Sequence, residues 1–380
     1  MFRDRTTFVI GAGASKEFGL PVGTELVKLI KARSQCDLND LDQPIRPSDS
    51  FMHAMLDRLY PDRARFQRAV SALNLIHRGL HTAVSIDAFI HRFQDDEDVV
   101  ALGKLLIAIE IAQAESDSLM HPNATALNEL KSETAHDTWI GSFLRILLDG
   151  VTNPSDIGKN VTIICFNYDR CIEYYLADAI SSAYNIVIED AEKIVAAMNI
   201  IHPYGTLGKL PWVQVSIDDD TLEFGPNIDL NTRWLSIAQR NIRTYTQQTH
   251  DVDATKKIHD AVGNCKVLVF LGFGFNNQNL DLLRVKEFQG EYPTSTRPVY
   301  ASGKGIKSQV QDTLTRRIGN LFPEYLQQMA SWKANVHIEY DKTCSELFEI
   351  HNMNMSKFTE RYADHEQGTL RFVERFRDEG

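Results

Sequence analysis

The fold is decided by the stretch Thr7-Phe8-Val9-Ile10-Gly11-Ala12-Gly13-Ala14-Ser15. Its first four residues indicate a short buried strand, and the glycine-rich turn at residues 11–15 follows at once and leads into a helical start. Such a turn lets bare backbone amides approach a phosphate, and the dipole of the following helix adds partial positive charge. Glycine turns also serve as plain connections between a strand and a helix, so the turn alone leaves both interpretations open.

Further short apolar runs predict the other strands of a parallel sheet. Most are followed by a glycine or polar turn and then by helical periodicity, which is typical of an α/β sheet covered by helices on both faces. We expect these strands at residues 161–166, 199–202, 266–272 and 297–301, with one more at 335–340. The predicted fold class is therefore a Rossmann-like α/β domain.

The pattern changes between the first strand and residue 161. Apolar residues there recur at helical spacing and no strand is convincing; examples are Val99, Leu102, Leu105, Leu106 and Ile109. We therefore expect a Rossmann-like domain of residues 1–36 and 151–350, interrupted by an all-helical insertion at 37–150. Residues 351–380 are charged and amphipathic and are predicted to form a C-terminal helical tail.

Composition narrows the class of protein. The 380 residues include no apolar run of the roughly 18 to 20 residues that a membrane helix needs, and the first residues lack the apolar segment of a secretory signal, so we expect a cytoplasmic protein without a membrane partner. The formal net charge of −11 disfavours autonomous nucleic-acid binding. The five cysteines are widely spaced and include no CxxC pair, which argues against a disulfide framework and excludes a cysteine zinc ribbon.

Polar residues and glycines follow the predicted strands at their carboxyl ends, which form the ligand-binding edge of a doubly wound sheet. Taken singly, each has a structural interpretation, such as a helix cap for Asp169 or a turn residue for Asn167. The candidates at this edge are Phe166, Asn167 and Asp169, then His202 and Tyr204, then Gly272, Gly274 and Asn276.

The order of four turns is more specific than any one of them. The turns Gly-Ala-Gly-Ala-Ser, Phe-Asn-Tyr-Asp, His-Pro-Tyr-Gly and Gly-Phe-Gly resemble, in this order, the sirtuin-like domains of prokaryotic antiphage defence proteins. The segment Ser-Ile-Asp-Ala-Phe-Ile at residues 85–90 is also similar to a segment of that group, so the resemblance covers residues 1–345. It implies cleavage of NAD, with Asn167 and a histidine as acting residues and residues 11–15 as the diphosphate-binding turn.

One departure from that group concerns the histidine. Tyr204 directly precedes Gly205, the place that a histidine holds in many relatives, and His202 lies two residues earlier. Residues two apart on a strand face the same side, so His202 still reaches the pocket if the strand continues. The sequence leaves both His202 and Tyr204 open as the catalytic base.

The chemistry of NAD cleavage suits these residue types. Nicotinamide leaves as a neutral base and needs no general acid, so the paired carboxylates of sugar hydrolases are not required. We expect Asn167 to orient the amide or water, Asp169 to accept hydrogen bonds from the ribose or carboxamide, and His202 to take a proton. The residues expected to bind NAD are Gly11, Ala12, Gly13, Ala14, Ser15, Phe166, Gly272, Gly274 and Asn276, and no metal is expected.

The sequence thus predicts an NAD glycohydrolase that yields nicotinamide and ADP-ribose, with NAD as substrate and no permanently bound cofactor. The resemblance implies an antiphage effector that depletes NAD, a homo-oligomer, and an ATPase partner of the HerA type. One alternative is a non-catalytic sensor of NAD or ADP-ribose. A protein deacylase is disfavoured by the missing zinc ribbon, and a dehydrogenase because the position about 20 residues after the turn, where its ribose-binding acid is usual, falls in an expected helix.

Overall fold

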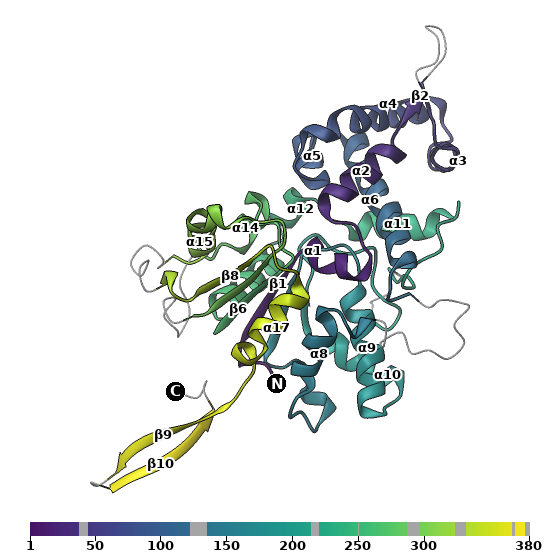
Figure 1. Ribbon diagram of the computed structural model, residues 1–380. Helices are drawn as coiled ribbons and strands as arrows, with labels where there is room; N and C mark the ends of the chain where they lie inside the picture. The colour runs from purple at the N-terminus through teal and green to yellow at the C-terminus, as the bar shows by residue number, and fades with distance from the viewer. Residues whose placement is uncertain are drawn as a thin grey trace.

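The computed structural model describes residues 1–37, 45–121, 135–213, 220–249, 251–286, 297–323, 332–366 and 369–376. Its centre is a parallel six-stranded sheet in the order β5-β4-β1-β6-β7-β8 (Figure 1). The strands are β1 (Thr6–Ile10), β4 (Val161–Cys165), β5 (Asn199–Ile201), β6 (Val267–Leu271), β7 (Val299–Gly303) and β8 (Val336–Tyr340). Each predicted strand is confirmed, and so is the Rossmann-like α/β class.

The strand order places a topological switch at the centre of the sheet. The chain moves outward from β1 through β4 to β5, and then returns to the other side of β1 to build β6, β7 and β8. Ile10 pairs with Cys165 on one side and with Leu271 on the other, so β1, β4 and β6 end at the same level. The loops that leave these three strands therefore meet at one edge.

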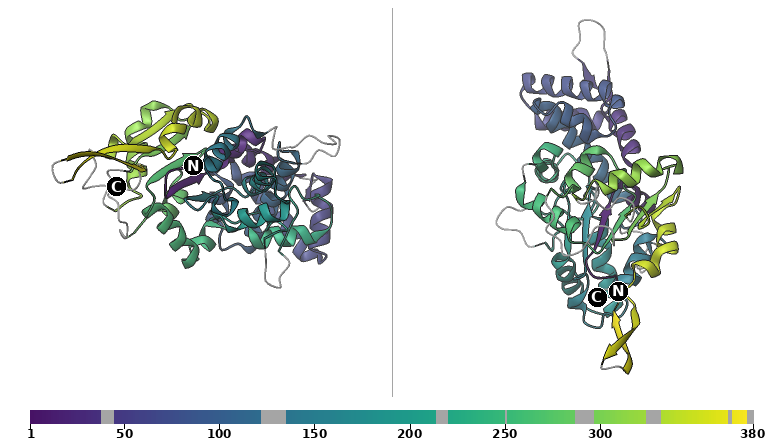
Figure 2. Two further views of the ribbon diagram at one scale, coloured as in Figure 1. Left: turned by 90° about the horizontal axis from the view of Figure 1, so that it is seen from below. Right: turned by 90° about the vertical axis from the view of Figure 1, so that its left-hand side faces the viewer.

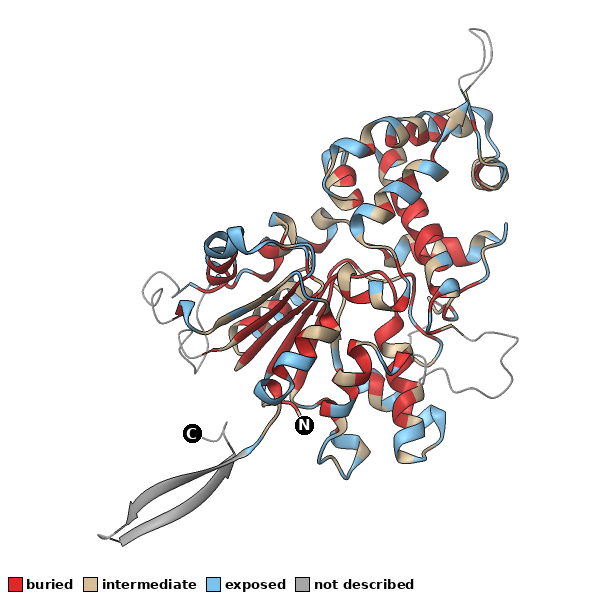
Figure 3. Cartoon of the chain, viewed as in Figure 1, coloured by how far each residue is buried: buried red, intermediate tan, exposed pale blue. Residues whose placement is uncertain are grey.

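Helices cover both faces of the sheet, and the central strands between them are buried (Figure 3). Neighbouring residues of each strand alternate between two apolar cores, one on each face. Phe8 and Ile10 pack into one core with α8 (Trp139–Leu148), α9 (Cys171–Tyr184), α10 (Ile188–Ala197) and α17 (Cys344–Met355). Val9 packs into the other core with α13 (Val252–Gly263), α14 (Asn277–Leu283) and α15 (Gln311–Gly319).

A helical lobe lies beyond the carboxyl edge of the sheet (Figure 1). Its members are α2 (Gly23–Arg33), α3 (Ser50–Leu59), α4 (Arg63–Gly79), α5 (Ile86–Arg92), α6 (Glu97–Asp117) and α11 (Thr232–Asn241). The middle of α6 is buried on all sides, and α2, α4 and α11 pack against it. The lobe therefore combines helices of the expected insertion with α2 and α11, which come from either side of it in the sequence, whereas α8 packs on the sheet.

The insertion is not wholly helical. The two-residue strands β2 (Cys36–Asp37) and β3 (Arg46–Pro47) pair antiparallel near its start. The remaining short elements are α1 (Ala12–Ser15), η1 (Lys16–Phe18), η2 (Leu80–Thr82), η3 (Pro154–Asp156), α12 (Tyr245–Thr249) and η5 (Ser308–Val310). All five cysteines are free thiols.

The prediction of a C-terminal helical tail is wrong beyond Met355. The helix α17 ends there, and β9 (Thr359–Glu366) and β10 (Thr369–Phe376) form an antiparallel pair. This pair extends away from the sheet and its helices in the views of Figure 2. Six of the residues from 359 to 376 are threonine, tyrosine, valine or phenylalanine, which favour strands, and these residue types outweigh the amphipathic charge pattern.

Candidate functional site

The two glycine turns expected to bind NAD lie against each other at the topological switch. A Cβ atom on Gly11 would lie 2.8 Å from the carbonyl oxygen of Gly272, and one on Gly13 would lie 2.8 Å from the Cα of Gly272. Gly272 has a φ of +56°, and a Cβ there would lie 2.0 Å from the amide nitrogen of Ala14. Close packing between β1 and β6 therefore requires glycine at all three positions, whatever ligand the turns meet.

Several backbone amides of the first turn are already bonded inside the chain. Gly11 N donates to Leu271 O at 2.9 Å, Gly13 N to Gly272 O at 3.0 Å, and Ala14 N to Gly11 O at 2.9 Å. The sequence predicts that amides of this turn bind a diphosphate, whereas these three donate to backbone oxygens of the chain itself. A phosphate at this turn would have to use the remaining amides of α1, whose first residue, Ala12, is half-buried.

A buried chain of polar side chains connects the first turn to the loop after β4. Asn167 Nδ2 donates to Gly11 O at 3.2 Å and to Ser15 Oγ at 2.8 Å, and Ser15 Oγ donates to Asp169 Oδ2 at 2.9 Å. Ser15, Asn167 and Asp169 are each at most 7% exposed. The structure thus brings together three of the predicted site residues, from two segments far apart in the sequence, at the carboxyl ends of β1 and β4.

Asp169 also serves the helix that follows it. Its Oδ1 accepts the amide of Cys171, the first residue of α9, at 3.2 Å. Burial raises the pKa of Asp169, and the nearby carboxylate of Glu115 raises it further. Asp169 is not the helix cap that the sequence suggests, because Arg170 holds the N-cap position of α9 and Asp169 lies one residue earlier. Its Oδ1 still bonds the first amide of the helix, and its Oδ2 accepts from Ser15.

His202 lies between the main chain of Asn167 and the side chain of Glu173. Its Nδ1 is 3.1 Å from the main-chain oxygen of Asn167, and its Nε2 is 2.8 Å from Oε1 of Glu173 in the first turn of α9. Burial by itself lowers the pKa of His202, but Glu173 and Cys165 together outweigh burial and hold that pKa well above its usual range. Sequence reasoning missed Glu173; the signal for it is an acidic residue at the third position of the predicted helix, one turn after Asp169.

Tyr204 points to a different partner from His202. Its hydroxyl donates to Asn279 Oδ1 in α14 at 2.8 Å, and its ring packs edge-on against Phe166 at a centroid distance of 5.8 Å. Phe166 also meets Phe273 edge-on at 5.2 Å. Burial raises the pKa of Tyr204, so its hydroxyl stays protonated. The two residues that the sequence leaves in competition for one role are thus held in separate interactions.

The helical lobe reaches this edge through Asp87. The hydroxyl of Tyr168, between Asn167 and Asp169, donates to Asp87 Oδ1 in α5. Burial raises the pKa of Asp87, and the hydrogen bond from Tyr168 counteracts part of that rise. Asp87 belongs to the segment at residues 85–90 on which the resemblance partly depends, so the motif was visible in the sequence but its contact was not.

The second glycine turn has one open position. A Cβ on Gly274 would meet no described atom within 4 Å, in contrast to Gly272. Asn276 caps the start of α14, and its Oδ1 accepts the amide of Asn279 at 2.9 Å. Phe275, between them, has a φ of 50°, a conformation that non-glycine residues adopt rarely and that often marks functional loops.

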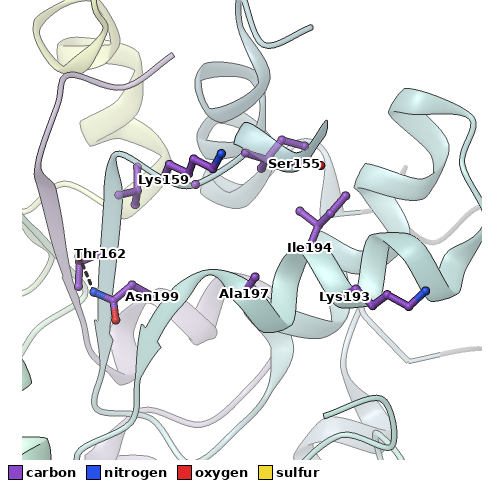
Figure 4. Close-up of a pocket in the computed structure, with 10 residues that line it drawn as sticks. Ser155, Lys159, Thr162, Lys193, Ile194, Ala197 and Asn199 are labelled. Carbon is purple, nitrogen blue, oxygen red and sulfur yellow. Dashed lines mark hydrogen bonds between the residues drawn. The ribbon is translucent and has the colours of Figure 1, made fainter. Parts of the chain in front are cut away.

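One cavity lies at the opposite end of the sheet. It has a volume of about 410 Å³ and is lined by the amino ends of β4 and β5 and by η3 and α10 (Figure 4). Asn199 and Thr162 at its wall bond each other at 2.9 Å, and the Lys159 and Lys193 ammonium groups pair with Asp156 and Asp190. This cavity is thus separate from the predicted site residues, which gather at the carboxyl edge.

No family model matches the chain, and neither a curated protein nor a solved structure matches it. In the described ranges, no helix has the length and apolar character needed to cross a membrane. Within the same ranges, no three histidine, cysteine or acidic side chains are grouped so that they could hold a metal ion.

Proposed function

We propose that the chain binds NAD at the carboxyl edge between β1 and β6 and hydrolyses its bond between nicotinamide and ribose. The observation that carries the proposal is the buried chain Asn167–Ser15–Asp169 beside the switch point of the sheet. When its six strands are numbered in chain order, the sheet has the order 3-2-1-4-5-6. Sheets of this order bind dinucleotides in the crevice where the order reverses. A buried carboxyl, amide and hydroxyl at that crevice supply the polar groups that orient a ligand.

The reaction places few demands on the protein. The bond from ribose C1′ to nicotinamide breaks with its electron pair passing to the cationic ring nitrogen, water bonds to C1′, and one proton is released. Asn167 is suited to orient the water or the carboxamide through its side-chain amide. Asp169 is suited to accept hydrogen bonds from the ribose or carboxamide, and the pKa of its carboxyl, raised by burial, suits it to take the proton that water loses.

A second function is favoured by one specific observation. The polar atoms of Ser15, Asn167 and Asp169 satisfy one another inside the chain, so the cluster is stable without performing chemistry. Such a site suits a protein that binds NAD or ADP-ribose and passes the signal to a partner. The sensor and the hydrolase share the binding site and differ in turnover.

The biological setting that we propose rests on the resemblance of the four turns alone. It is NAD depletion in antiphage defence, by a homo-oligomer that works with a HerA-type ATPase in the cytoplasm.

The test is to incubate the purified chain with NAD and separate the products. Equal amounts of nicotinamide and ADP-ribose, formed without a peptide substrate, support hydrolysis. Tight binding without turnover supports the sensor. If the chain neither binds nor cleaves NAD, both the hydrolase and the sensor are overturned.

A further inference from the structure

We propose that His202 and Glu173 form an imidazolium–carboxylate pair that positions Asn167, so that His202 does not itself take a proton in the reaction. The pair is a property of the fold, whereas its consequence for turnover rests on the proposed function.

The hydrogen-bond geometry assigns the protons. His202 Nδ1 is 3.1 Å from the main-chain oxygen of Asn167, and a carbonyl oxygen only accepts hydrogen bonds. His202 Nε2 is 2.8 Å from Glu173 Oε1, and an ionised carboxylate also only accepts. With Glu173 ionised, as its lowered pKa favours, both ring nitrogens carry a hydrogen. A ring in that state has no lone pair with which to accept another proton.

The surroundings favour the charged pair. The side chains of His202 and Glu173 are only 11% and 19% exposed, so water screens them little. The other titratable groups around the pair are Cys165 on β4, and Asp169 and Arg170 at the start of α9. Burial raises the pKa of Glu173, but the charge of His202 outweighs burial, with help from Arg170, and lowers it.

The pair depends on both members. Oε2 of Glu173 is buried and has no hydrogen-bond partner among the described residues, so His202 provides the bond that compensates this carboxylate. Loss of His202 alone would leave a poorly compensated buried charge, which is strongly destabilising. A test of His202 must therefore also change Glu173.

The consequence for Asn167 is that it is held at both ends. Its main-chain oxygen accepts from His202, and its side-chain amide donates to Gly11 and Ser15. Fixing both ends sets the direction of the amide, and small losses of such alignment cost rate. His202 is therefore a positioning residue.

The first experiment reads protonation directly and needs no turnover. The full chain is labelled with ¹⁵N-histidine, and the His202 ring signals are identified by their loss in His202→Asn/Glu173→Gln. We expect both ring nitrogens of His202 to be protonated at neutral pH. Glu173→Gln keeps the shape of the side chain and removes its charge, so in this variant we expect the pKa of His202 to return toward the ordinary histidine value of about 6.5. A neutral His202 in the wild type, or an unchanged titration in Glu173→Gln, overturns the pair.

The second experiment compares two double variants by NAD turnover and thermal melting. His202→Asn/Glu173→Gln keeps an N–H donor near the Asn167 oxygen, whereas His202→Ala/Glu173→Gln removes it. We expect the asparagine variant to stay within about tenfold of Glu173→Gln, and the alanine variant to lose about 10² in rate. If both fold and lose about 10² or more, as the removal of a general base predicts, the positioning role is overturned.

The pH profile gives a further readout. A positioning imidazolium predicts a rate that is flat across neutral pH and falls at alkaline pH, as the raised pKa of His202 is passed. A rate that climbs through neutral pH with the loss of one proton, and that loses this dependence in His202→Asn/Glu173→Gln, contradicts it. If the wild type does not cleave NAD, the proposed function fails, and the ring signals still decide the pair.

Discussion

Gly13 and Gly272 touch across the topological switch of the sheet. The amide of Gly13 donates to Gly272 O at 3.0 Å, and a Cβ on Gly13 would lie 2.8 Å from the Cα of Gly272. The glycines of both turns therefore have a role inside the fold, in addition to the approach of a phosphate that the sequence predicts. A variant at Gly13 tests the fold together with binding, so other positions are needed to separate the two.

Gly272→Ala is expected to destabilise the chain, whereas Gly274→Ala is its matched control. Alanine at 272 requires a φ of +56° and meets the amide nitrogen of Ala14 at 2.0 Å, whereas alanine at 274 meets open space. We expect a loss of about 2 kcal/mol or more at 272, since a strained backbone alone costs 1–3 kcal/mol. Chemical denaturation measures both, and equal stability of the two variants would contradict the close packing.

Gly274→Ala also probes ligand binding without disturbing the turn. If NAD lies against the second glycine turn, a side chain added at 274 occupies space that the ligand needs, because no described atom lies within 4 Å of it. We expect the affinity for NAD to fall about tenfold, which corresponds to about 1.4 kcal/mol, with no change in the thermal melt. Calorimetry at matched pH and salt gives the result, and an unchanged affinity removes Gly274 from the binding site.

Tyr204→Phe is expected to leave turnover within about threefold of the wild type. The hydroxyl of Tyr204 bonds Asn279 and takes no part in the Asn167–Ser15–Asp169 chain, so its loss costs one buried hydrogen bond, typically about 1 kcal/mol of stability. Steady-state rates and chemical denaturation of Tyr204→Phe, with Asn279→Ala as its partner control, check this. A fall in rate of about 10² in a folded Tyr204→Phe would transfer the base role to Tyr204.

Asp87→Asn is expected to stabilise the chain at neutral pH. The folded pKa of Asp87 is raised by burial, so stability falls as pH rises from the ordinary aspartate value of about 3.9 through the raised folded value. Asparagine keeps an acceptor for the Tyr168 hydroxyl and does not ionise. The gain over the wild type should therefore grow from acid to neutral pH in denaturation series, and a gain that shrinks with rising pH would show that the charged form of Asp87 is favoured in the fold.

The sheet could be predicted because its strands are short, apolar and buried on both faces, as in the run Val267–Leu271. The position of the candidate site at the carboxyl edge of the sheet could be predicted because Asn167 and Asp169 follow one such strand directly, and parallel strands bring their carboxyl ends together.

The contacts of His202 could not be predicted, because they depend on how the first turn of α9 packs beside the end of β5, which sequence spacing does not report. The same is true of the contact between Asp87 and Tyr168. The C-terminal strands were missed because Lys357 to Arg377 mix charge and apolar residues in a way that suits either a helix or a strand.

The most direct test of whether Asn167 acts on NAD at the carboxyl edge of the sheet is nicotinamide release by the wild type and by Asn167→Ala. We expect the wild type to release nicotinamide and the variant to lose about 10² or more in rate. We also expect a loss of only about 1–2 kcal/mol in stability, since the main-chain oxygen of residue 167 still accepts from His202. Near-normal release by a folded Asn167→Ala would contradict the account.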